Sequence, residues 1–208
     1  MKRKYLGLVL ILCLSLVGCT SSNKKFERGT LNNGIYNNES FNLEFVYPDN
    51  LQQTGKESIA YLYGCQPIAN EDWTMTFEKC KAEKNTNYYW DVALESKDGT
   101  EFTGILIEDI SVRDKKPALE TLIDEQMNAA KKWAGEEVFI TEPYEMNIQG
   151  QTFKAFTYIA TSPSNPEEDY FGMTAIRIEG NYAIMISVTV NSTDKKAFND
   201  VMKIYTAE

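Results

Sequence analysis

The chain has 208 residues, a formal net charge of −9 and no histidine. Without histidine, the usual Ser-His-Asp and Cys-His catalytic arrangements and HExxH zinc sites are excluded. An acidic chain is repelled by phosphate backbones, so we expect no nucleic-acid partner.

The first residues have the pattern of a secretory signal peptide. Basic residues at positions 2–4 precede an apolar run at positions 5–17, which Gly18 and Cys19 follow. This run is shorter than the roughly 20 residues that span a hydrocarbon core. Charge, then an apolar run, then a small residue is the order of a cleaved signal peptide. Because a cysteine closes the lipobox at positions 16–19, we expect a lipid-bearing thiol at Cys19 after removal of residues 1–18.

With this order of features, residues 1–19 resemble bacterial lipoprotein precursors. The resemblance implies an extracytoplasmic protein at the cell surface, anchored to the bacterial cell membrane through lipid on Cys19. Two or more acyl chains give a stable anchor. Thr20 is not the Asp that retains some lipoproteins at an inner membrane, which implies the outer membrane in a host with two. An uncleaved anchor, or an ordinary signal with a chance cysteine, is the alternative.

After the signal peptide, the predicted organisation is a short tether followed by one domain. Removal of residues 1–18 takes away three basic residues, so the net charge changes from −9 to −12. Residues 19–33 are polar and show no period, which predicts a flexible tether. Residues 34–208 are predicted to form a single domain with one core.

The first predicted strand of this domain covers residues 41–47. Its larger apolar side chains alternate with other residues, which is the period of a half-buried strand. We expect residues 34–36 to pair with it across the turn at residues 37–40. The alternating residues are Phe41, Leu43, Phe45 and Tyr47.

Residues 51–84 give the least readable pattern and contain both cysteines of the predicted domain, Cys65 and Cys80. Disulfides persist outside the cytoplasm, so we expect these two to be bridged; separate buried thiols are the alternative. Two cysteines without histidine do not supply a four-ligand thiolate zinc site. Glu167, Glu168 and Asp169 could hold calcium, but their spacing matches no EF-hand loop, so a solvated loop is the preferred interpretation. We assign no metal and no cofactor.

Four aromatic residues are candidates for a binding groove: Trp73, Tyr88, Tyr89 and Trp90. Asp72 and Asp91 adjoin two of them, and aromatic faces beside a carboxylate suit a sugar or a peptide. Ordinary core and cross-strand packing is the alternative.

The next predicted elements are a hairpin and a helix. Residues 88–96 and 101–112 alternate as two strands, and the Asp98-Gly99 pair predicts a type I′ turn between them. A helix is predicted over residues 117–134 because apolar residues recur at helical spacing after Pro117. On this helix we expect Leu122, Ile123 and Met127 to face the sheet.

Two further hairpins and a last helix complete the chain. The predicted strands are residues 138–148 and 151–161, joined at Gln149-Gly150, then 170–179 and 183–190, joined at Gly180-Asn181. Ile184, Ile186 and Val188 are predicted to lie in the centre of the sheet. A C-terminal helix follows, with an apolar face from Ala197 to Tyr205.

Hairpins dominate this order, which predicts an α+β fold: a mainly antiparallel sheet packed by a long central helix and a C-terminal helix. The opening Phe-Asn-Leu-Glu-Phe-Val-Tyr-Pro at residues 41–48 and the order of elements resemble the PsbP-like α/β/α sandwich family. The resemblance implies that the domain binds or assists other proteins, without an active site shared across the family.

We therefore expect a non-enzymatic binding or assembly role, with the membrane reached through Cys19 and an unknown protein or glycan as partner. No catalytic residue is assigned. A secreted carboxylate-dependent hydrolase is the alternative, although the sequence does not show the separation of carboxyl groups that glycoside hydrolysis requires.

Overall fold

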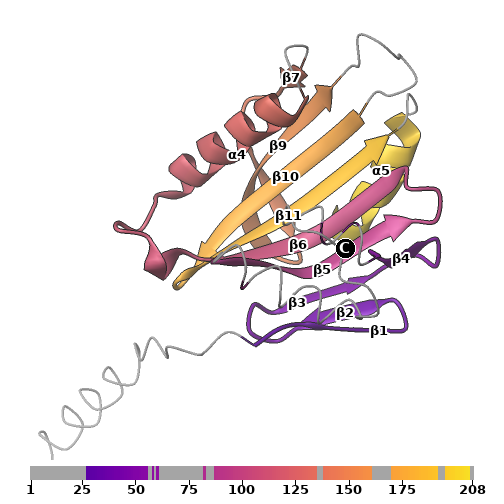
Figure 1. Cartoon of the computed structure of the whole chain (residues 1–208), viewed down its shortest axis with the longest axis horizontal. Coiled ribbons are helices and arrows are strands. Elements are labelled where there is room, and N and C mark those ends of the chain that lie inside the picture. The colour runs from indigo at the N-terminus through magenta and orange to yellow at the C-terminus, as the bar shows by residue number, and fades with distance from the viewer. Residues whose placement is uncertain are drawn as a thin grey trace, which may run out of the picture.

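The computed structural model describes residues 27–55, 87–134, 138–160, 170–191 and 195–206, together with residues 58, 60 and 82. The five long segments form two antiparallel sheets, two α-helices and one short 3-10 helix (Figure 1). The prediction of a mainly antiparallel α+β fold is confirmed.

A small sheet of three strands forms first. It comprises β1 (Thr30–Asn32), β2 (Ile35–Asn38) and β3 (Leu43–Val46) in that order. The predicted β2–β3 hairpin is confirmed, with Tyr36 opposite Phe45. The four alternating residues predicted to face the core, Phe41 to Tyr47, are each at most 3% exposed. Periodicity alone therefore identified the buried face of this sheet.

The predicted tether of residues 19–33 extends too far along the chain. Residues 30–32 form β1, which pairs with β2 through Asn33 and Gly34. Both turn residues have positive φ, 50° and 76°, as a two-residue hairpin turn requires. Periodicity did not predict this strand, because β1 pairs with β2 through backbone hydrogen bonds and buries few apolar side chains.

A large sheet forms the middle of the molecule. Its strands are β4 (Leu51–Gln53), β5 (Tyr88–Ser96), β6 (Glu101–Asp109), β11 (Tyr182–Asn191), β10 (Tyr170–Glu179), β9 (Gln151–Ala160) and β7 (Val138–Ile140), in this spatial order. A further strand, β8 (Tyr144–Ile148), also pairs with β9. The 3-10 helix η1 (Ile110–Val112) follows β6.

Two predicted details of these strands are wrong. Residues 138–148 form two strands rather than one, and the break between them contains Pro143, which has no N–H for a sheet ladder. At the β5–β6 turn, Gly99 has a φ of 72° but Asp98 is not among the positive-φ residues, so the turn is not type I′. Hydrogen bonds from Ser96 and Thr100 instead hold the Asp98 carboxylate and lower its pKa to about 2.

The two helices pack on opposite faces of the large sheet. Helix α4 (Leu119–Ala134) begins two residues after Pro117 and packs on β9 and β10. Leu122 and Ile123 are fully buried there, and Met127 is partly buried, as predicted. Helix α5 (Lys195–Thr206) packs on the other face, against β11, β10, β8 and β3.

The central strand β11 contributes to both faces. Ile184, Ile186 and Val188 are fully buried, but they belong to the core on the α5 side. The alternate residues Ala183 and Met185 pack with α4. Because both faces of the sheet are covered, α4 does not share a core with the apolar stripe predicted from the sequence.

A chain of hydroxyl groups ties the small sheet to α5 and the large sheet. Thr103 Oγ1 donates its single proton to the carbonyl oxygen of Ser187 at 3.1 Å. It therefore acts as the acceptor in its hydrogen bond with Tyr205 Oη at 2.5 Å. Tyr47 Oη lies 3.2 Å from Tyr205 Oη. Burial raises the pKa of Tyr205 to about 12, against hydrogen bonds with Thr103 and Tyr47 that lower it. The network therefore stays protonated at neutral pH.

Candidate functional site: a groove between α4 and the large sheet

A groove of about 800 Å³ runs along the α4 side of the large sheet. It lies beside the part of the sheet that α4 covers, over β5, β6, β11 and β10. Its described lining residues are Asn87, Tyr88, Trp90, Phe102, Leu106, Glu108, Arg113, Gln126, Ala129, Ala130, Tyr158, Thr174, Met185, Ser187 and Thr189. A concave surface of this size, mainly apolar with a few polar groups, is typical of ligand sites.

Strand alternation decides which of the predicted aromatic residues reach this groove. Tyr88 and Trp90 on β5 line it. Tyr89 lies between them and packs against the core on the opposite face, so its predicted place in the groove is wrong. Trp73 lies outside the described residues. The structure therefore brings together two of the four predicted residues.

A β-bulge on β5 separates the groove from a second polar cluster. The register shifts between Trp90 and Val92, so Asp91 and Val92 both turn away from the groove. The Asp91 carboxylate accepts from Tyr36 Oη at 2.6 Å and from Asn38 Nδ2 at 2.7 Å. Asp91 therefore does not serve the groove, contrary to the reason given for the aromatic cluster.

Two glycines let aromatic rings approach the backbone closely at the floor of the groove. A Cβ at Gly104 would lie 2.9 Å from the Trp90 ring and 2.7 Å from the carbonyl oxygen of Val92. A Cβ at Gly172 would lie 2.0 Å from the Tyr158 ring. The Trp90 ring also meets Phe102 edge-on, with centroids 5.4 Å apart. These contacts fix the floor before any ligand arrives.

One end of the groove carries a hydrogen-bonded ion-pair network. Glu108 Oε1 accepts from Arg113 Nε at 2.8 Å and from Asn87 Nδ2 at 3.1 Å. Arg113 Nη1 reaches the carboxylate of Glu125 on α4 at 2.9 and 3.0 Å. Burial alone would lower the pKa of Arg113, but its bonds with Glu108 and Glu125 raise it overall. The network fixes the distance between β6 and α4, and hence the width of this end.

Hydroxyl groups on β10 and β11 line the rest of the floor. Thr174, Ser187 and Thr189 belong to the lining. Tyr158 Oη lies 3.2 Å from Thr189 Oγ1. Burial raises the pKa of Tyr158, against the hydrogen bond with Thr189, which lowers it. The floor thus offers neutral hydrogen-bonding groups between aromatic faces.

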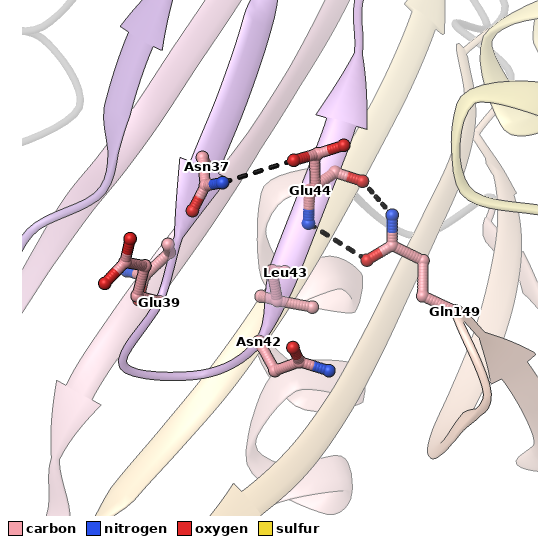
Figure 2. A pocket seen from close by; sticks show the side chains of 7 residues that line it. Asn37, Glu39, Asn42, Leu43, Glu44 and Gln149 are labelled. Carbon is pink, nitrogen blue, oxygen red and sulfur yellow. Dashed lines mark hydrogen bonds between the residues drawn. The ribbon is translucent and has the colours of Figure 1, made fainter.

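A second, polar hollow of about 320 Å³ lies at the β2–β3 turn. Figure 2 shows that Gln149, from the β8–β9 turn, pairs through its side-chain amide with the backbone of Glu44. Asn37 Nδ2 donates to the Glu44 carboxylate at 3.2 Å. Because these polar groups already form hydrogen bonds with one another, we interpret the hollow as part of the contact between the small sheet and the β8–β9 turn.

Three other predicted site residues lie outside the described residues. These are the lipid-attachment residue Cys19 and the pair Cys65 and Cys80. The bridge between the last two stays a prediction, which titration of free thiols in the oxidised mature protein decides. Among the described residues, no group of three or more acidic or thiol side chains is placed to hold a metal ion. No described helix is long and apolar enough to cross a membrane.

Sequence reasoning missed the ion-pair network and the two floor glycines. Glu108 and Arg113 stand five positions apart across a strand end, where no period connects them. Gly104 and Gly172 each interrupt an apolar strand, and an isolated glycine in a strand signals a close approach. The two glycines in their strands were therefore a usable signal of close approach, but the sequence does not show which aromatic ring approaches each of them.

Comparison with known proteins gives fold-level likeness at low identity. No family model matches the chain, and no curated protein matches it. The solution structure of a cyanobacterial PsbP protein (CyanoP) from Synechocystis is similar with a TM-score of 0.46 and 9% identity, over 89% of this chain and 93% of that one. A Pseudomonas aeruginosa protein of unknown function gives a TM-score of 0.36 and 13% identity, over 88% and 99%. At these values the likeness supports no argument about function.

Proposed function

We propose that this protein is an extracytoplasmic lipoprotein, anchored through Cys19, whose domain has a non-enzymatic binding or assembly role. The groove between α4 and the large sheet takes the partner, a protein segment or a glycan. One observation carries the proposal: a groove of about 800 Å³ combines aromatic rings and hydroxyl groups on its floor with a fixed polar end. Such sites gain affinity from apolar area and orientation from a few polar groups.

A substitution on the lip of the groove tests this proposal. Ala129 is exposed on α4 and lines the groove. We expect Ala129→Arg to fill the lip with a long charged side chain and to reduce recovery of the partner in crosslinking pull-downs from the protein's own membrane. The neighbouring Asn128 is exposed but is not part of the lining, so Asn128→Arg is the matched control. Equal recovery with both variants would place the binding surface elsewhere.

The alternative, a carboxylate-dependent hydrolase, fits the groove less well. Among the described lining residues, Glu108 is the one carboxylate, and Arg113 and Asn87 already bond to it. Glycoside hydrolysis uses two carboxyl groups on either side of the bond. A screen of peptidoglycan, peptide, ester and phosphoester substrates separates the two functions. Turnover that disappears in Glu108→Gln would favour the hydrolase.

Lipidation of Cys19 gives the second test of the proposal. We expect the intact mass of the mature protein to include a diacylglyceryl group, because Cys19 ends a lipobox. Cys19→Ala should leave the protein without lipid and either released or unprocessed. A mature wild-type protein without acyl mass would contradict the proposed location.

A further inference from the structure

The chain that follows the proposed lipid is fixed to the domain from residue 27 onward. Glu27 N donates to Ser40 Oγ at 3.2 Å, and Gly29 N donates to the two oxygens of Asp91 at 3.0 and 3.1 Å. Arg28 Nη2 donates to the carbonyl oxygen of Trp90 at 3.1 Å. The predicted tether of residues 19–33 is therefore attached to the domain from residue 27 onward.

This attachment sets an upper limit on the distance between lipid and domain. Glu27 follows Cys19 by eight positions. A fully extended chain covers ~3.3–3.6 Å per residue, so the connection spans at most about 29 Å. A domain of about 180 residues has a radius of gyration of roughly 16 Å and a diameter of about 40 Å. The connection is too short to reach around the domain.

The contacts of residue 27 show which end of the domain lies near the lipid. Ser40 belongs to the β2–β3 turn. The ring of the next residue, Phe41, packs edge-on against Tyr182, which starts β11, with centroids 5.7 Å apart. At the β10–β11 turn, the carbonyl oxygen of Gly180 accepts from Lys116 Nζ at 2.6 Å. We call these three segments, residues 39–42, 180–181 and 111–117, the tether end.

Figure 1 shows the tether end on the left, and the β5–β6 turn, residues 97–100, at the opposite end of the molecule. Beside the exposed carboxylates Glu39 and Asp114, the tether end carries groups that suit a lipid surface. Val112 is 64% exposed, and Lys115 and Lys116 are exposed beside it. Lysine side chains near an anionic leaflet are attracted to it within a Debye length. An exposed apolar group among them fits the boundary of the headgroup layer.

From the short connection and these contacts, we propose that the tether end lies against the lipid surface and that the β5–β6 turn points away from it. The proposal rests on the proposed lipidation of Cys19. Arg113, at the polar end of the groove, belongs to the tether end. The polar end of the groove therefore lies nearer the membrane than its other end, which Phe102 and Thr189 line beside the β5–β6 turn.

Nuclear magnetic resonance of the lipidated mature protein in nanodiscs tests the orientation. The nanodiscs contain anionic lipid and a small share of lipid carrying a gadolinium chelate, which broadens nearby amide signals. We expect broadening at residues 39–42 and 111–116 to be several-fold stronger than at residues 97–100. A variant with a long Gly/Ser insertion after Asn23 is the control, because its longer connection should remove most of this difference.

The outcomes separate the orientation from the lipid anchor. Intact mass on the same sample shows whether Cys19 carries lipid; without it, the proposed function fails and the orientation fails with it. With the lipid present, equal broadening at both ends, or stronger broadening at residues 97–100, overturns the orientation alone. Lys115→Glu combined with Lys116→Glu should weaken the broadening at the tether end. Unchanged broadening at the tether end in this variant would contradict the contact of Lys115 and Lys116 with the lipid surface.

Discussion

Replacing Asp91 with alanine is expected to lower the free energy of unfolding by about 3 kcal/mol or more. The side chain of Asp91 is fully buried and pairs with Arg28 Nε at 3.6 Å. It is also the acceptor for Tyr36 Oη, Asn38 Nδ2 and Gly29 N. Removing it leaves these buried donors without a partner, and each such loss costs about 1–3 kcal/mol. Urea or thermal unfolding measures the effect.

A matched control shows whether the loss of stability is specific to the hydrogen-bonded cluster around Asp91. Asp114 is exposed, so Asp114→Ala should change stability by no more than about 0.5 kcal/mol. The Asp91 variant should also be cut faster by trypsin after Arg28, because the N-terminal segment loses its attachment. Equal stability of the two variants would show that Asp91 is not the point that holds this segment.

The second large effect concerns the two cores. Leu122→Ala and Ile186→Ala are each expected to cost about 2–5 kcal/mol, because both side chains are fully buried and truncation leaves a cavity. Leu122 belongs to the core under α4, and Ile186 to the core under α5 and the small sheet. The losses therefore arise on opposite faces of one sheet.

Val112→Ala provides the comparison for these core variants. Val112 is 64% exposed, so its truncation should change the unfolding midpoint little. Denaturant unfolding of the three variants, followed by circular dichroism, measures the ranking. A midpoint for Leu122→Ala or Ile186→Ala equal to that of Val112→Ala would mean that the buried faces were assigned wrongly.

Local patterns in the sequence determined the elements and many of their inner faces. Alternation marked Phe41 to Tyr47 as buried, and helical spacing selected Leu122 and Ile123 on α4. Both signals work because the period of a regular backbone is fixed, so neighbours in the sequence report the same face. The same signals predicted most of the hairpins, since hairpin strands are adjacent in the chain.

The tertiary structure alone decided how these faces meet. Strand order places β11 beside β6, and both faces of β11 are buried, so the stripe at Ile184 faces α5 while Met185 faces α4. A period of two shows that a strand has two distinct faces, but it does not show which helix or sheet packs against each face. Alternation on β5 also places Tyr89 and Trp90 on opposite faces of the sheet. Their adjacency in the sequence does not show this.

The anchoring of the N-terminal segment was decided in the same way. Residues 27–33 are polar and lack a period, and such a sequence by itself predicts a tether. They are held because a bulge on β5 aims Asp91 at the backbone of Gly29, more than 60 positions earlier. Backbone hydrogen bonds to a distant carboxylate leave no trace in local composition. The sequence therefore predicted a lipobox ending at Cys19, and the fold decided that the chain is attached to the domain from residue 27 onward.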